Sequence, residues 1–334
     1  MQDPDTTSQA RPAFLITVDT EGDDLWSRPR QITTENARFL PRFQSLCEKY
    51  GLKPTWLVNY EMAECPAFVE FGRDVLKRGA AEIGMHLHAW NTPPLVPLTD
   101  DDMRHQPYLS EYPEAAIRDK IAFMTDLLEE RFQCKMLSHR AGRWGLNAIY
   151  ARALVERGYQ VDCSVTPHVS WAEYLGDPRG AGGPDFTGFP ELPYFVDLDQ
   201  IDRPGDSPLL EVPVSVIETR HARLDARLQS GPKWLRRISR RICPPVLTMV
   251  PRDNRRSFRR MHAILRRAVD GHWPCVLMAT HSSELMPGGS PFFPMPGSIE
   301  RFYRRLEVLF ASAADKFRGL TLAEFRKEID AQLI

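Results

Sequence analysis

The 334-residue sequence predicts an α/β fold: a distorted (β/α) barrel, closed or incomplete, with seven to eight parallel strands. Short, continuous apolar runs alternate with segments of helical periodicity, which is the pattern of parallel strands joined by crossover helices. The chain is long enough for one large barrel or two ordinary domains, and we expect a single domain. Several apolar runs end in reactive polar side chains, as strands do at the carboxyl edge of barrel enzymes.

The amino-terminal half contains the clearest elements. A continuous apolar run predicts a buried strand over 13–18, and a helical pattern follows over about 34–50. Two more strands are predicted at 54–58 and 81–87, with a helix between them that begins at Pro66. This order of strand and helix is typical of parallel β-α-β units.

The alternation continues through the middle of the chain. A long helix is predicted at 113–132, a strand at 135–140, a helix at 146–157 and a strand at 159–164. Glycines and prolines then mark a long loop over about 165–208. Long loops in compact domains often bind substrate.

The last third begins with a predicted strand at 209–216 and then changes composition. A basic insertion is predicted at about 220–260, and residues 220–267 contain fifteen Lys and Arg against two Asp and Glu. Within it, 234–242 has the pattern of a basic amphipathic helix. That helix is either a solvated outer face or a docking surface for an anionic membrane or glycan. A further strand is predicted at 275–280.

The bulk properties indicate a cytoplasmic barrel domain over 13–334, preceded by a disordered leader at 1–12. The net charge of −1 gives no general attraction to nucleic acid, which is therefore not an expected partner. The six cysteines are widely spaced without a Cys-x-x-Cys pair, which is typical of reduced, individually buried thiols. We find no signal peptide pattern, and no apolar run reaches the roughly 20 residues that span a bilayer. The oligomeric state is left open.

Two histidines end the third predicted strand, in the segment EIGMHLH (82–88). Because side chains alternate along a strand, His86 and His88 point to the same face and can bind one metal ion. A carboxylate is available at the end of the first strand, from Asp19 or Glu21. Two histidines and a carboxylate with open positions form the pattern of a hydrolytic metal centre. The alternative is a pair of surface histidines.

Reactive side chains end other predicted strands as well, namely Arg140, Asp162 and His281. Polar, reactive residues at the converging ends of several otherwise apolar strands are hard to explain by stability alone. Each residue still has a structural alternative: an ion pair for Arg140, a loop cap for Asp162 and a core position for His281. Asp19 could likewise cap a loop through an Asx-turn. His139 is expected to point away from Arg140 by strand alternation.

The order of these segments resembles the polysaccharide deacetylase family, the NodB-homology carbohydrate esterases, and within it the subgroup of lipopolysaccharide and surface-glycan biosynthesis. The resemblance covers roughly residues 13–285. The family motif Thr-Phe-Asp-Asp-Gly corresponds here to TVDTEG (17–22), and His-x-x-x-His corresponds to EIGMHLH (82–88). Arg-x-Pro-Tyr corresponds to RAGRWG (140–145), and the Asp-bearing segment of the family to VDCS (161–164). The last motif, Leu-x-His, corresponds to MATH (278–281).

The resemblance implies a metal-dependent amide hydrolase. Glu21, His86 and His88 would hold a divalent metal, with Zn²⁺ as the expected ion. The metal would polarise the N-acyl carbonyl of the substrate and lower the pKa of a bound water to about 7.

The remaining strand-end residues take catalytic roles by the same resemblance. Asp19 would accept the proton of the water as general base, and Arg140 would fix Asp19 and keep it ionised. His281 would protonate the leaving amine, and Asp162 would orient His281. The implied substrate is an N-acetylated or N-formylated sugar of a glycan or glycan precursor.

Two departures from the family motifs leave alternatives open. The Asp-Asp pair is replaced by Asp19-Thr20-Glu21, and Trp90 stands where the second family histidine would be. Which carboxylate binds metal is therefore open. The same scaffold could instead hydrolyse a C–N bond in a small non-sugar amide, or it could bind a glycan or partner protein without catalysis. The basic insertion suggests peripheral contact with a membrane or an anionic glycan.

Overall fold

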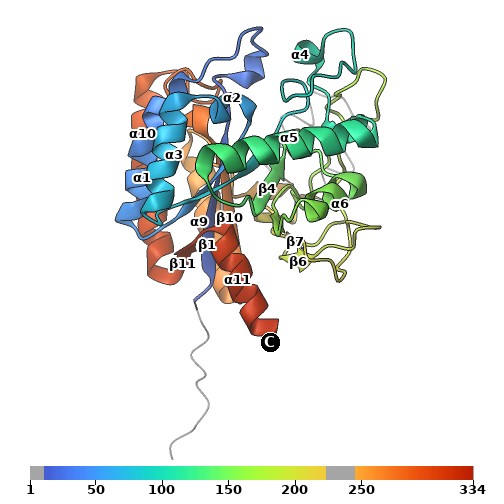
Figure 1. Cartoon of the computed structure of the whole chain (residues 1–334). Coiled ribbons are helices and arrows are strands. Elements are labelled where there is room, and N and C mark those ends of the chain that lie inside the picture. Colours follow the sequence, from blue (N-terminus) through green and yellow to red (C-terminus); the bar gives the residue numbers. More distant parts are fainter. Residues whose placement is uncertain (1–10, 223–244, 334) are drawn as a thin grey trace, which may run out of the picture.

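The computed structural model describes residues 11–222 and 245–333, which form a curled sheet surrounded by helices (Figure 1). The strands in these ranges are β1 (Ala13–Thr20), β2 (Pro54–Val58), β3 (Glu82–Leu87), β4 (Ser138–Ala141), β5 (Val161–Asp162), β6 (Tyr194–Phe195), β7 (Leu210–Glu211), β8 (Val216–Glu218), β9 (Val246–Thr248), β10 (Cys275–His281) and β11 (Arg318–Leu320). The α-helices are α1 (Leu40–Lys49), α2 (Tyr60–Ala63), α3 (Pro66–Lys77), α4 (Asp102–His105), α5 (Glu114–Phe132), α6 (Ala148–Glu156), α9 (Arg255–Asp270), α10 (Pro296–Lys316) and α11 (Leu322–Leu333).

The main sheet has nine strands in the order β10-β1-β2-β3-β4-β5-β7-β6, with β11 paired to the first half of β1. Among the described residues, only β6 runs antiparallel to its neighbour in this sheet. The carboxyl ends of the parallel strands therefore meet at one edge. The sheet curls into a half-barrel, so the predicted distorted (β/α) barrel is confirmed in its incomplete form.

The gap between the two ends of the half-barrel is bridged by single backbone hydrogen bonds. Val214 N donates to Val165 O beyond β5, and Ser215 N donates to Leu277 O in β10. Pro213 lies between β7 and β8 and has no N–H to continue a ladder. The single strand predicted here is therefore split into two short strands, and β8 pairs with β9 in a separate antiparallel sheet.

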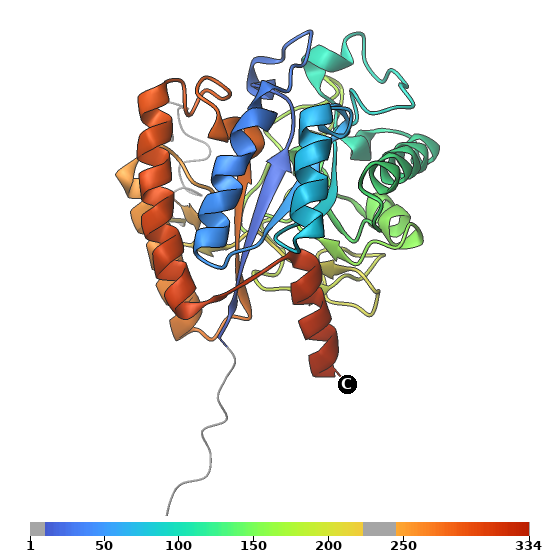
Figure 2. The ribbon, with the colours of Figure 1, turned by 60° about the vertical axis from the view of Figure 1, so that its left-hand side comes forward.

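The sheet separates two apolar clusters, because alternate side chains of each strand face opposite sides. In β1, Phe14 and Ile16 pack outward with the helices, while Ala13 and Leu15 pack inward with residues of β5, β7 and β10. Figure 2 shows the helices standing side by side in front of the sheet. The inward row of β1 continues with Thr17 and then reaches its carboxyl end.

The amino-terminal end of the half-barrel is covered by α11, which lies below the other helices in Figure 2. Leu322 and Phe325 of α11 join the inner apolar cluster. At the start of the helix, Leu322 N donates to Thr55 Oγ1 and Ala323 N donates to Glu82 Oε2. With this end closed by apolar packing, the polar strand ends at the opposite edge are where a ligand can enter.

Several smaller predictions can be compared with the structure. Of the basic insertion predicted at 220–260, residues 223–244 lie outside the described residues, and so do residues 1–10 of the predicted leader. The five described cysteines are free, but two of them, Cys65 and Cys134, are only half-buried, so the prediction of individually buried thiols is met in part. In the part of the chain that the structure describes, no helix has the length and apolar character to cross a membrane.

Candidate metal centre and active site

Side chains from three strands meet at the carboxyl edge of the sheet. Asp19 and Glu21 come from the end of β1, His86 and His88 from the end of β3, and His281 is the last residue of β10. The parallel register places Asp19 directly beside His281. All five side chains line one cavity. The structure thus brings together three of the strand ends that the sequence singled out.

Glu21, His86 and His88 form a buried group of metal-ligating atoms. Glu21 Oε2 lies 3.6 Å from His86 Nε2 and 3.4 Å from His88 Nε2. Ligand atoms held tetrahedrally at Zn²⁺ bond lengths are about 3.3 Å apart, so the observed spacing is close to the spacing required. The donor set of two imidazoles and one carboxylate could therefore bind a divalent metal.

Different contacts orient the two histidines. His86 Nδ1 lies 3.0 Å from the carbonyl oxygen of Arg140, which can only accept a hydrogen bond, so Nδ1 carries the proton and Nε2 keeps its lone pair toward Glu21. His88 stacks on Trp90, with ring centroids 4.3 Å apart and planes inclined by 17°. Burial is the main cause that lowers the pKa of His88 well below its usual value. His88 is therefore neutral, the form that binds a metal.

The backbone of Glu21 is fixed from two sides. Its N–H donates to Ser282 Oγ at 3.0 Å, and its carbonyl oxygen accepts a hydrogen bond from Asn36 Nδ2 at 2.9 Å. Gly22 N donates to Glu61 Oε1 at 3.1 Å. Because the turn after β1 is held in this way, the Glu21 carboxylate is directed toward the histidines of β3.

Gly142, the first residue after β4, leaves the space that His88 occupies. A Cβ at this position would lie 2.4 Å from His88 Cδ2 and 2.4 Å from the carbonyl oxygen of Leu87. We expect Gly142→Ala to displace His88, to weaken metal binding by about 10- to 100-fold and to lower the free energy of unfolding by about 1–3 kcal/mol. Competition with a metal-sensitive dye and thermal melting would measure both effects.

Gly188→Ala is the matched control for this change, because a Cβ there would have no neighbour within 4 Å. It should leave metal affinity unchanged. Equal metal affinities for the two alanine variants would contradict the role assigned to Gly142.

Asp19 is held by a buried arginine rather than by the metal-ligating group. Arg140 Nη1 donates to Asp19 Oδ1 at 2.6 Å, and Arg140 Nη2 donates to Thr17 Oγ1 at 2.7 Å. The Arg140 side chain is fully buried, and its Nε donates to Cys163 O. Burial alone would raise the pKa of Asp19, but the charge of Arg140, with smaller contributions from two nearby histidines, lowers it below its usual value. Asp19 is therefore ionised at neutral pH.

His281 lies between two carboxylates. Its Nε2 is 3.7 Å from Asp19 Oδ2, and its Nδ1 is 3.5 Å from Glu284 Oε2. Glu284 is fully buried and is held by Thr280 Oγ1 at 2.9 Å and by Arg252 Nη1 at 3.0 Å. Burial opposes a charge on His281, but Glu21, Glu284 and Asp19 raise its pKa to about 9. His281 is thus protonated at neutral pH and faces the cavity.

Glu284 was not singled out from the sequence, although it follows His281 by only three residues. We expect Glu284→Gln to remove a negative charge beside His281 and so to lower its pKa. For a general acid, which acts when protonated, the basic limb of the pH–rate profile should then move to lower pH, with activity below that limb nearly unchanged. The pH dependence of kcat would measure this shift.

The exposed Glu300, which is paired with Arg42, offers the matched control Glu300→Gln. This variant should keep the pH profile of the parent protein. If the basic limb of Glu284→Gln stayed in place too, Glu284 would have no part in setting the charge of His281.

The structure places Asp162 away from His281, contrary to the role predicted for it. Its Oδ1 lies 2.6 Å from His139 Nδ1, and the other ring nitrogen of His139 lies 2.8 Å from the Tyr150 hydroxyl. The two residues face the opposite side of the sheet from Arg140, as expected for His139 from strand alternation. Asp162 also contacts the buried Glu211, whose pKa is raised by burial and by Asp162 itself. The group joins β4, β5 and β7 behind the cavity.

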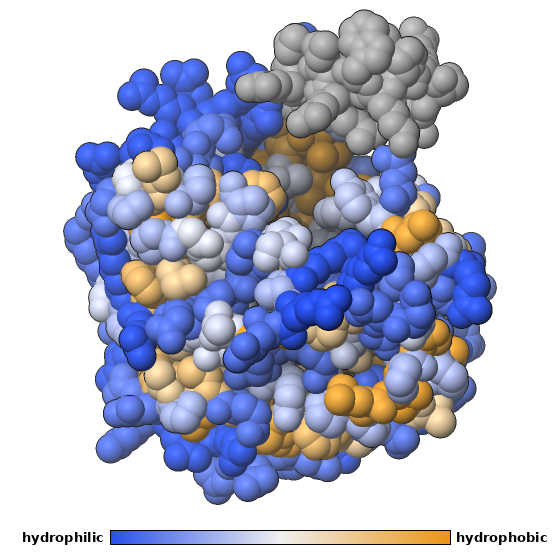
Figure 3. Space-filling model, turned by 90° about the horizontal axis from the view of Figure 1, so that it is seen from above, coloured by the Kyte–Doolittle hydropathy of each residue, from blue (hydrophilic) through white to orange (hydrophobic). Residues whose placement is uncertain are grey.

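The cavity around these residues measures about 620 Å³. Seen from above, the surface is hollowed at this edge of the sheet and apolar side chains show in the hollow (Figure 3). Its lining contains several aromatic residues, namely Trp26, Trp90, Tyr108, Trp144, Trp171, Tyr174 and Phe292. Trp144 and Trp171 are stacked with their planes inclined by 19°. The cavity can therefore hold a ligand much larger than an acyl group, with flat apolar faces against its walls.

The half-barrel is a fold shared with solved structures described as polysaccharide deacetylases. A candidate glycoside hydrolase/deacetylase from Parabacteroides distasonis superposes with a TM-score of 0.62 at 12% identity, over 98% of this chain and 73% of that one. A candidate polysaccharide deacetylase from Mycobacterium smegmatis gives a TM-score of 0.54 at 14% identity, over 100% of this chain and 94% of that one.

The sequence matches no protein-family model and no curated protein. At such low identities the structural similarity establishes the fold, and it confirms the predicted resemblance at that level. The chemistry has to be argued from the residues of the cavity.

Proposed function

We propose that the protein is a metal-dependent amide hydrolase that removes an acetyl or formyl group from the nitrogen of a sugar. The observation that carries this proposal is the buried group Glu21, His86 and His88, with an ionised carboxylate and a protonated imidazole in the same cavity. These are the components that amide hydrolysis requires, namely a metal site, a base and an acid.

The first chemical step concerns the water nucleophile. A divalent cation bound to Glu21, His86 and His88, with Zn²⁺ as our proposal, would polarise the acyl carbonyl and make the attacking water more acidic. Asp19 accepts the proton of this water, for which its ionised state is required. Arg140 directs the Asp19 carboxylate and keeps it charged. Because Arg140 also donates a hydrogen bond to Thr17 of the same strand, the position of the Asp19 carboxylate is fixed relative to the sheet.

The second step is departure of the amine. An amide nitrogen leaves only when it is protonated, and His281 is the proton donor in the cavity. Glu284 Oε2 accepts a hydrogen bond from the His281 backbone N–H and lies 3.5 Å from Nδ1, which leaves Nε2 on the side of Asp19 for the substrate. Glu284 thus takes the orienting role that the sequence resemblance assigned to Asp162.

The proposed substrate class is an N-acylated sugar of a glycan or glycan precursor. The stacked pair Trp144 and Trp171 and the edge-on pair Trp26 and Phe292 offer flat apolar faces to a sugar ring. The relatives support a carbohydrate substrate, since they include a candidate polysaccharide deacetylase.

The test is release of acetate or formate from N-acetylated and N-formylated hexosamines and short oligosaccharides by the full-length protein loaded with Zn²⁺. We expect turnover that disappears on chelation and returns when metal is added. Turnover of cyclic or linear non-sugar amides alone would assign a different C–N hydrolase activity. Stoichiometric metal without turnover of any amide would overturn the enzyme proposal in favour of a binding protein.

A further inference from the structure

A surface patch at the mouth of the cavity combines exposed apolar side chains with arginines. We call it the rim patch and define it as the exposed residues of segment 291–296, which are all but the buried Phe293, together with Arg255, Arg259, Arg301 and Arg304. In the segment, which has the sequence PFFPMP, Met295 is 66% exposed and Phe292 is 37% exposed. An exposed cluster of this kind is costly in water unless another surface covers it.

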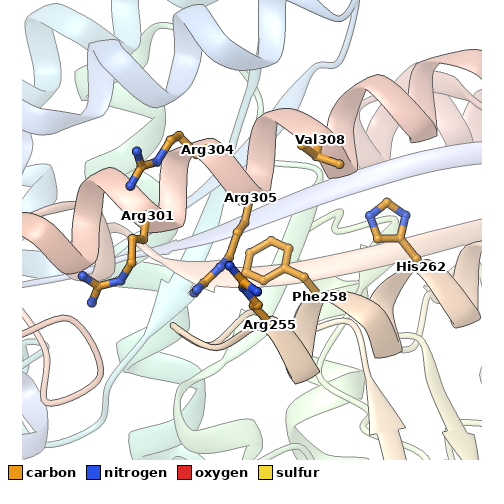
Figure 4. A pocket seen from close by; sticks show the side chains of 7 residues that line it. All are labelled: Arg255, Phe258, His262, Arg301, Arg304, Arg305 and Val308. Atoms are coloured by element: carbon orange, nitrogen blue, oxygen red, sulfur yellow. The ribbon is translucent and has the colours of Figure 1, made fainter.

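The apolar and basic parts of the rim patch are neighbours. Helix α10 begins at Pro296, so Arg301 and Arg304 lie in its first turns, directly after the apolar segment. Arg255, Arg301 and Arg304 line a surface groove of about 460 Å³ between α9 and α10, with the exposed Val308 beside them. Figure 4 shows the arginines of this groove projecting from the two helices around Phe258.

The positive charges of the arginines in the rim patch are only partly balanced by nearby carboxylates. Arg301 pairs with Asp253, with Nη2 and Oδ2 2.8 Å apart. For Arg255 and Arg304, no carboxylate lies within ion-pair distance among residues 11–222 and 245–333. The surface therefore has positive charge available for an anionic partner, although the whole chain has a net charge of −1.

The rim patch is continuous with the cavity wall. The ring of Phe292 packs against Trp26 with centroids 5.8 Å apart, and both residues line the cavity. The guanidinium of Arg252, another lining residue, lies 4.0 Å above the Phe292 ring. A surface that covered the rim patch would therefore lie next to the mouth of the active site.

We propose that the rim patch docks the protein onto an anionic phospholipid bilayer, with the mouth of the cavity next to the membrane surface. Apolar side chains surrounded by arginines are suited to the headgroup region, where methionine and phenylalanine enter the acyl boundary and arginines bind phosphates. A nucleic acid would engage the arginines but would leave Met295 and the prolines exposed to water. Docking would present membrane-anchored glycans to the cavity, although vesicle binding itself does not depend on hydrolase activity.

The experiment is co-sedimentation of the full-length protein with vesicles of phosphatidylcholine alone or with 30% phosphatidylglycerol added. We expect binding to the anionic vesicles that falls steeply with added salt. Each basic residue near an anionic surface contributes about a fivefold change in partition coefficient, so Arg255→Glu/Arg304→Glu should weaken binding by about thirtyfold or more. Met295→Asp should weaken it as well, by placing a charge where an apolar side chain enters the bilayer.

Lys77→Glu/Lys135→Glu is the matched control, because it makes the same change in net charge at exposed positions away from the cavity. It should retain most of the binding. The proposal is overturned if the parent protein binds neither vesicle, if it binds both equally, or if the two double variants lose binding equally. Binding to nucleic acid that is lost in the rim variants, without vesicle binding, would assign the patch to a different partner. Circular dichroism and thermal melting would confirm that each variant is folded.

Discussion

Replacing both histidines of the metal group, His86→Ala/His88→Ala, should abolish stoichiometric metal binding and reduce hydrolysis by at least about a thousandfold. Two of the three ligand atoms that lie within bonding reach of one cation are lost, and Glu21 alone cannot hold it in a buried site. The loss in rate follows from the several kcal/mol by which such a cation stabilises the transition state. Metal content by mass spectrometry and single-turnover assays would measure the two effects.

A second readout does not depend on activity. A metal that binds only the folded state raises the melting temperature, so a chelator should lower the melting temperature of the parent protein but leave that of the double variant unchanged. His105→Ala/His272→Ala removes two imidazoles outside the cavity and should retain both metal and the response to chelator. Near-stoichiometric metal in His86→Ala/His88→Ala would show that the cation binds elsewhere.

Asp19→Asn should reduce kcat by about 10²- to 10⁴-fold while the bound metal is retained. The amide cannot accept the proton of the attacking water, and general-base catalysis contributes a factor of this size. The metal stays because Glu21, His86 and His88 are unchanged. If Asp19 were instead a metal ligand, the variant would lose metal and activity together, so metal content decides between the two roles.

The same variant should lower the free energy of unfolding by about 3–5 kcal/mol, because the buried guanidinium of Arg140 loses its only charged hydrogen-bonding partner among the described residues. In the parent protein the pKa of Asp19 is lowered on folding. The ion pair therefore stabilises the fold above the normal pKa of an aspartate and is lost as the pH falls through the lowered value. Denaturant unfolding at pH 7 would measure the difference, and Asp185→Asn at an exposed position is the control.

The sequence was sufficient to predict most of the strand ends that meet in the cavity. A period of two along a strand puts His86 and His88 on one face and Asp19 and Glu21 on one face, whatever the rest of the fold does. The apolar character of the strands predicted that they are buried on both sides, and the order of strand and helix predicted parallel pairing. These are local properties, and they predicted the parallel sheet and the pair of histidines, while the choice between Asp19 and Glu21 as the third metal-ligating residue stayed open until the structure placed them.

Other features depended on how distant segments pack. The partner of His281 is Glu284, not Asp162, because the register of β5 turns Val161 inward and Asp162 outward toward His139. No local pattern in a strand of two residues determines which side it presents to a sheet. The gap in the half-barrel is likewise bridged by hydrogen bonds from Val214 and Ser215 to Val165 and Leu277, which are distant in the chain.

Sequence alone therefore predicted which polar residues stand at the strand ends and, for the histidines of β3, that they share one face, since both are set by neighbouring residues. Tertiary structure alone decided which side chain each carboxylate meets. Asp19 pairs with Arg140 across 121 positions, and Glu21 meets the histidines of a strand more than 60 residues later. Such pairings are fixed by the order and stagger of strands in the sheet, which arise from the packing of the whole core rather than from any one segment.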